Sequence, residues 1–117
     1  MNAIVFSFTR NGAKISLKLQ KYLDSCGFAT EIFTTRRYRD LDPALKEIGP
    51  SLQLMCKEAF PLCRLMVFIG ATGIAIRSIA PYIRNKTKDP AVISIDEQGK
   101  VVIPLLIRND QPLMISG

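Results

Sequence analysis

A glycine-bearing loop follows a short apolar run near the middle of the chain. Arg64–Ile69 leads into Gly70-Ala71-Thr72-Gly73, after which apolar residues recur at helical spacing. A strand that opens through glycines into a helix leaves backbone N–H groups free to bind an anion. We therefore predict that these four loop residues, with Arg77 on the following helix, contact an anionic ligand. The alternatives are a tight turn with close helix packing for the glycines and a solvated position for Arg77.

Two adjacent carboxylates, Asp96 and Glu97, begin a tight turn of sequence DEQG. Such groups can position or deprotonate a water molecule, so both are candidate catalytic residues, with a structural role in the turn as the alternative. Histidine is absent from the chain. This absence excludes a histidine general base, Ser-His or Cys-His pairs and the ordinary zinc and haem sites. We predict no metal site, and reduced, mostly buried cysteines, since the three present form no C-x-x-C pair.

The formal net charge is +6, from sixteen basic and ten acidic residues. An excess of this kind predicts a polyanionic partner or a solvated basic face. Arg36, Arg37 and Arg39 cluster after the second β-rich run, with Tyr38 as the one aromatic residue among them. Nucleic-acid binding usually interleaves more aromatic residues. We expect an acidic small molecule rather than nucleic acid.

No apolar run approaches the roughly 20 residues that span a membrane. The N-terminal segment is β-rich from Ala3 onward and carries no basic region or small-residue cleavage site typical of a signal peptide. We therefore expect a cytoplasmic protein with no membrane partner. A homodimer is left open.

Apolar spacing and turn residues divide the chain into alternating strands and helices. Residues 35–49 are polar and are expected to form mostly loop, with one helical turn. Strands are expected at Ala3–Phe8, Ala29–Thr34, Arg64–Ile69, Ala91–Ile95 and Lys100–Leu106, and helices at Asn11–Cys26, Ser51–Phe60 and Thr72–Ala80.

This alternation predicts an α/β domain with a flavodoxin-like, three-layer α/β/α fold, mostly parallel, with an antiparallel C-terminal edge strand. The expected order has the second strand outermost, then the first, third and fourth. Ligands of such sheets bind beyond the carboxyl ends of the strands, at the switch point between the first and third. There the loop that carries Ser7, Thr9 and Arg10 should face Gly70–Gly73, with the Asp96-Glu97 turn along the same edge.

Residues 68–106 resemble the signature stretch of the CbiG proteins of cobalamin biosynthesis. In outline that family shows F-x-G-A-x-G-I-A-x-R-x-I-A-P, then Lys, Asp-Pro-Ala-Val and Asp-Glu-x-Gly, before an I-x-L-L strand. The matching residues here are Phe68, Gly70, Ala71, Gly73, Ile74, Ala75, Arg77, Ile79, Ala80, Pro81, Lys86, Asp89, Pro90, Ala91, Val92, Asp96, Glu97, Gly99, Leu105 and Leu106.

The resemblance implies an enzyme of the anaerobic branch of vitamin B12 synthesis that hydrolyses cobalt-precorrin-5A. In that reaction the lactone is opened and a two-carbon unit leaves as acetaldehyde. The cobalt arrives in the substrate, so no cofactor is implied, and the partner is a polycarboxylate cobalt-corrinoid. Lys86 and Asp89 match the family pattern and join the candidate substrate-binding residues, although the expected topology places them at the opposite edge of the sheet.

The sequence departs from the family pattern at Ile107, where CbiG proteins continue with a Ser-Gly-His segment, a Gly-Gly-Ala-Asn helix start and further domains. We predict a single α/β domain over residues 1–106 and a divergent tail over residues 107–117. Three functions are left open: the hydrolase in a truncated form, a non-catalytic corrinoid-binding module, and a generic flavodoxin-like domain that binds an anion or nucleotide.

Overall fold

Six strands form one sheet in the computed structural model, which describes residues 2–84 and 89–107. Their order is β3-β2-β1-β4-β5-β6, and every neighbouring pair is parallel except β5 with β6. The predicted α/β class with an antiparallel edge strand is therefore confirmed. The strands are β1 (Ala3–Ser7), β2 (Thr30–Thr34), β3 (Leu45–Glu47), β4 (Leu65–Ile69), β5 (Ala91–Ile95) and β6 (Val102–Leu106).

The central strands β1 and β4 are buried along their whole length. Successive side chains alternate between the faces of the sheet. Phe6 and Phe68 therefore belong to the core cluster on one face, and Val5 and Val67 to the cluster on the other. Phe6 lies opposite Phe68 in the register, and their rings stack with centroids 5.1 Å apart. Strands covered on both faces have continuous apolar sequences, which is why these two are readily predicted.

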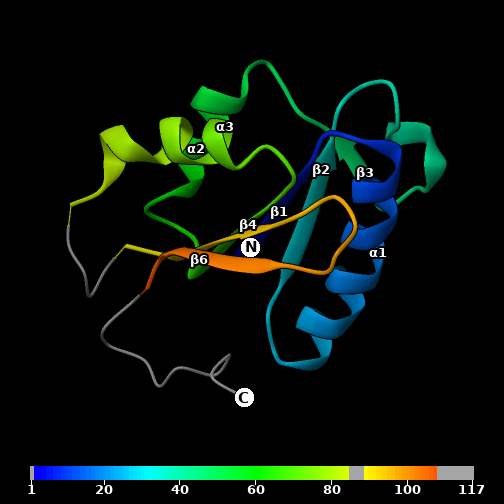
Figure 1. Ribbon diagram of the computed structural model, residues 1–117, viewed down its shortest axis with the longest axis horizontal. Helices are drawn as coiled ribbons and strands as arrows, with labels where there is room; N and C mark the ends of the chain where they lie inside the picture. The colour runs from blue at the N-terminus through cyan, green and yellow to red at the C-terminus, as the bar shows by residue number, and fades with distance from the viewer. Residues whose placement is uncertain (1, 85–88, 108–117) are drawn as a thin grey trace.

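The helices cover both faces of the sheet, so the predicted three-layer arrangement is confirmed. Figure 1 shows α1 (Arg10–Ser25) on one side and α2 (Leu52–Ala59) with α3 (Thr72–Ile79) on the other. Thr9 caps α1 by accepting the Gly12 N–H at 3.0 Å, and Ser51 caps α2 by accepting the Leu54 N–H at 3.1 Å. Within the part of the chain that the structure describes, no helix is long and apolar enough to cross a membrane.

Strand β3 corrects the predicted loop over residues 35–49. It pairs in parallel with β2 and is therefore the outermost strand, the position predicted for β2. The expected helical turn is present as the 3-10 turn η1 (Arg39–Leu41), and a second, η2 (Ala80–Tyr82), follows α3. Leu45 is the one buried residue of β3. An ion pair between Lys46 and Glu31 at 2.6 Å links β3 to β2. A three-residue strand with one apolar side chain gives no periodic signal, which explains the error.

The β5–β6 hairpin is organised by the Asp96 side chain. Its Oδ1 accepts the Lys100 N–H at 2.6 Å and the Val101 N–H at 2.8 Å. The backbone carbonyl of Asp96 accepts the Gly99 N–H at 2.9 Å, and Gly99 has a φ of +72°, which favours glycine. Hydrogen bonds from the backbone, above all from Val101, hold the pKa of Asp96 below its ordinary value.

Gly12→Ala should destabilise the protein because α1 approaches the sheet closely at this position. A Cβ atom there would lie 3.0 Å from Thr9 Oγ1, 3.3 Å from Ser7 Cβ and 3.4 Å from Ile69 Cγ2. Overpacking of this kind costs about 1–3 kcal/mol. Urea unfolding would measure the change in the free energy of unfolding.

Gly73→Ala is the matched control, since Gly73 lies in the first turn of α3. Its added Cβ would meet Arg77 Nη1 at 3.6 Å, an ordinary contact. Helix propensity should then leave stability unchanged or raise it by up to about 1 kcal/mol. An equal decrease in the free energy of unfolding for Gly12→Ala and Gly73→Ala would contradict the close approach of α1 to the sheet.

Asp96→Ala should lower the melting temperature at neutral pH more than Asp96→Asn, because asparagine keeps one acceptor oxygen for the turn. The folded pKa of Asp96 lies below its unfolded value of 3.8. The charged carboxylate therefore stabilises the fold above about pH 4, and this contribution is lost as the pH falls through the lowered folded pKa. The difference in melting temperature between wild type and Asp96→Asn should shrink on acidification. A difference independent of pH would show that the charge does not stabilise the turn.

Candidate functional site

The predicted ligand site, called the crevice below, is the position between the carboxyl ends of β1 and β4 at which the sheet topology switches. These two strands are neighbours in the sheet. The chain leaves β1 for α1 on one face and leaves β4 for α3 on the other (Figure 1). In parallel sheets, loops that diverge in this way leave a crevice in which ligands bind.

Contacts between distant segments bring the predicted loops together at this edge. Asn11, next to Arg10, donates a side-chain hydrogen bond to the backbone carbonyl of Glu97. The Gly70 N–H donates to the Ile95 carbonyl at 2.6 Å, which joins the β4–α3 loop to the end of β5. A Cβ on Gly70 would lie 3.2 Å from Glu97 Cγ, so the Glu97 side chain lies against Gly70. The β1–α1 loop, the β4–α3 loop and the β5–β6 turn therefore form one surface.

The start of α3 differs from the starts of α1 and α2 because no side chain caps it. Gly70 has a φ of +81°, and Ala71 at the N-cap is left-handed with φ 55° and ψ 49°. Ala71 is the one non-glycine residue with positive φ within residues 2–84 and 89–107. That conformation costs a non-glycine residue roughly 1–3 kcal/mol, and such strain often occurs at ligand sites.

Hydroxyl groups near the crevice take part in the fold. Ser7 is fully buried and its hydroxyl donates to the Phe33 carbonyl at 3.5 Å, while Thr9 caps α1. Thr72 Oγ1 and Ser94 Oγ lie 2.6 Å apart and share a hydrogen bond, which ties the first residue of α3 to β5. The substrate-binding role of Ser7, Thr9 and Thr72 stays a prediction. Asn11 and Ser94 were not among the predicted site residues, since only the folded chain brings them to their partners.

Two predicted arginines are exposed at this edge. Arg77 lies one turn along α3, and its Nη1 would be 3.6 Å from a Cβ on Gly73, so the guanidinium lies close to the helix start. Arg10 begins α1, and its Cζ lies 5.7 Å from the centroid of the Tyr38 ring. Both guanidinium groups can reach a ligand that lies over the carboxyl edge. Their binding role stays a prediction.

The two predicted catalytic carboxylates have different surroundings. Asp96 accepts several backbone N–H groups of its own turn, and its lowered pKa makes it a weak proton acceptor. Glu97 is exposed, and its side chain extends over Gly70. Of the two, Glu97 is therefore the better placed to accept a proton from a water molecule at the crevice.

Cysteine is a poor nucleophile candidate here. Cys56 and Cys63 are buried, and burial raises the pKa of Cys56 to about 12 and that of Cys63 to about 11. Both thiols are therefore protonated at neutral pH. Cys26 is free and exposed, near the end of α1.

Asp89 lies at the opposite edge of the sheet, as the topology predicted. It precedes β5, is 6% exposed, and its Oδ2 accepts the Arg84 N–H at 2.7 Å. Lys86 and the tail from residue 108 onward lie outside the described residues, so the predictions for them are not tested.

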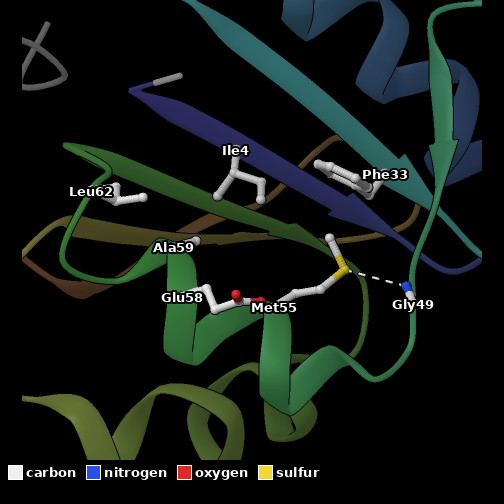
Figure 2. A pocket seen from close by; sticks show the side chains of 7 residues that line it. All are labelled: Ile4, Phe33, Gly49, Met55, Glu58, Ala59 and Leu62. Carbon is white, nitrogen blue, oxygen red and sulfur yellow. Dashed lines mark hydrogen bonds between the residues drawn. The ribbon is translucent and has the colours of Figure 1, made fainter.

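An apolar hollow of about 260 Å³ lies apart from the predicted site, between α2 and the sheet. Figure 2 shows Met55 reaching from α2 toward Gly49, whose N–H donates to the Met55 sulfur at 3.4 Å. Ligand pockets usually occupy about 300–1,000 Å³, so this hollow is too small for a tetrapyrrole. Its lining residues are Ile4, Phe33, Gly49, Met55, Glu58, Ala59 and Leu62.

Comparisons with known proteins agree with the motif analysis. Residues 54–108 match the family model described as cobalamin synthesis G N-terminal. Over 102 residues the chain is 33% identical to a protein from Salmonella typhimurium named cobalt-precorrin-5A hydrolase, covering 87% of this chain and 27% of that protein. A protein of the same name from Priestia megaterium is 25% identical over 105 residues, with the same two coverages.

A solved structure supports the fold. A cobalamin biosynthesis protein G homolog from Sulfolobus solfataricus superposes with a TM-score of 0.60 at 22% identity, over 90% of this chain and 29% of that one. The chain thus spans about a quarter of the length of the curated relatives that it matches. The resemblance predicted from the Gly70–Gly73 loop and its neighbours is confirmed, and the chain is related to the N-terminal region of the CbiG family of cobalamin biosynthesis.

Proposed function

We propose that this chain binds a polycarboxylate cobalt-corrinoid at the carboxyl edge of its sheet and takes part in opening the lactone of cobalt-precorrin-5A. The observation that carries the proposal is the convergence of three loops at the β1–β4 crevice. Together they present the uncapped start of α3, the Arg77 guanidinium and the Glu97 carboxylate. The names of the matched relatives support this substrate and a role in cobalamin biosynthesis.

Lactone hydrolysis needs an activated water and a means to stabilise negative charge. The oxygen of water adds to the lactone carbonyl carbon, the ring C–O bond breaks, and a carboxylate and an alcohol are formed. Glu97 would accept the proton of the attacking water. The free N–H groups at the start of α3 would stabilise the negative charge that develops on the carbonyl oxygen. In the next step the alcohol loses its O–H proton, the C–C bond to the macrocycle breaks and the two-carbon unit leaves as acetaldehyde, while the electron pair of that bond stays on the macrocycle. Cobalt is present as part of the substrate.

A second candidate function is a corrinoid-binding module without catalysis. It is favoured by the coverage of the relatives, since about three quarters of their length has no counterpart in this chain. On this proposal the crevice holds the substrate, and catalytic groups outside these 117 residues complete the reaction.

Incubation with cobalt-precorrin-5A separates these functions. Binding is followed by the absorbance of the corrinoid, and acetaldehyde by its NADH-linked reduction. The hydrolase should bind the corrinoid and release acetaldehyde, whereas the module should bind it without release. Tight nucleotide binding with no corrinoid affinity would contradict both and favour a generic anion-binding domain.

Glu97→Gln should lower the rate of acetaldehyde release by about 100-fold or more, because a positioned general base contributes a factor of that order. Corrinoid affinity should change little, since glutamine keeps the side-chain shape over Gly70 and the backbone carbonyl that Asn11 contacts. Glu58→Gln is the matched control, an exposed glutamate of α2 away from the crevice. Equal rates for wild type and Glu97→Gln would show that Glu97 is not the base.

A further inference from the structure

Two arginines lie near the ring of one tyrosine at the β2 end of the carboxyl edge, and a third is next to them in sequence. Arg36 and Arg37 follow β2 after one intervening residue, and Arg10 follows β1 at the start of α1. The Cζ atoms of Arg10 and Arg37 each lie 5.7 Å from the centroid of the Tyr38 ring. All three arginines are exposed, while Tyr38 is half-buried and packs against the α1-side core. Two loops that are distant in sequence thus form one positively charged surface.

None of these three guanidinium groups is neutralised within the described ranges 2–84 and 89–107. The ion pairs there engage other cations: Arg39 with Glu47 at 2.7 Å and with Asp40 at 3.7 Å, and Lys46 with Glu31. Arg39 is adjacent to Tyr38 in sequence, but its ion pair with Glu47 directs it to strand β3. Three neighbouring positive charges without a carboxylate repel one another, so an anion that binds between them is favoured.

The Tyr38 ring holds two of these groups in place. A guanidinium near an aromatic ring gains a cation–π attraction and keeps its N–H edge available for hydrogen bonds. That edge matches a carboxylate, to which an arginine can donate two parallel hydrogen bonds. Because the ring already orders the side chains of Arg10 and Arg37, less rotational freedom is lost when a ligand binds.

We propose that Arg10 and Arg37, ordered by Tyr38, form with the adjacent Arg36 a subsite for the peripheral carboxylates of the ligand bound at the β1–β4 crevice. The inference rests on the corrinoid binding proposed above and assigns an orientation to the bound corrinoid. Adjacent strands lie about 4.8 Å apart, so the β2 loop is about 10 Å from the Gly70 loop. The arginines lie on the β2 side of the crevice, whereas the Glu97 side chain lies against Gly70 on its β4 side. Ligand carboxylates therefore bind toward β2, away from Glu97.

Two probes test the subsite: cobyrinic acid, a cobalt-corrinoid with free peripheral carboxylates, and its methyl-esterified form. The double variant R36Q/R37Q should bind the acid at least about tenfold more weakly, because charged hydrogen bonds are lost. Its affinity for the ester should change little. The matched control is K18Q/K21Q, which removes the same charge from exposed positions farther along α1. It should change acid binding less than threefold at about 0.15 M salt, where distant charges are screened.

Tyr38→Leu tests whether binding depends on the ordering of the arginines by the tyrosine ring or only on their positive charge, since it leaves every arginine in place. It should weaken acid binding and spare ester binding, with the melting temperature confirming that the variant is folded. Equal acid affinity in wild type and R36Q/R37Q, or an equal loss in K18Q/K21Q, would overturn the subsite and leave the proposed function standing. Failure of the wild type to bind either corrinoid would instead overturn the proposed function. Loss of single-stranded RNA binding in R36Q/R37Q, with acid binding unchanged, would assign the arginines to nucleic acid.

Discussion

The parallel pairing of β1 with β4 is the constraint on which the rest of the structure depends. Its register sets Ser7 opposite Ile69, so both strands end at the same height and their loops leave the sheet side by side. A slip of one residue would turn every core side chain to the opposite face. Gly12 then allows α1 to lie close against the ends of both strands. The two loops are held side by side because this pairing is fixed by two cores at once, one on each face of the sheet.

In the function proposed above, the carboxyl edge would recognise its ligand by geometry more than by reactive side chains. Each contact between an anion and a helix start is typically worth about 0.3–1 kcal/mol, so no single group can hold a large ligand. The edge instead distributes its charge along the sheet, with guanidinium groups beside β2 and β1, and the uncapped start of α3 together with the Glu97 side chain at the β4 loop. An order of this kind can distinguish the two ends of an asymmetric polyanion.

Much of the fold could be predicted because its signals are local. β1 and β4 are continuous apolar runs, and helical spacing with capping residues marks α1. β3 could not be predicted, since its stability comes from pairing with β2 and from ion pairs rather than from an apolar pattern. The site likewise has a predictable part and an unpredictable part. The Gly70–Gly73 loop could be predicted from its local motif. The contacts of Asn11 with Glu97 and of Arg10 with Tyr38 could not, because they form only once the strands are ordered in the sheet.

The contact between Asn11 and Glu97 also bears on how the protein is made. The two residues are 86 positions apart, and together they join the first loop of the sheet to its last hairpin. A nascent chain that has left the ribosome only as far as β4 can pair β1, β2 and β4, yet it lacks the residue that closes the crevice. Contacts between residues so distant in sequence form late, because the intervening chain must first be ordered. The surface that the three loops form is therefore complete only once the β5–β6 hairpin has been translated and has folded against α1.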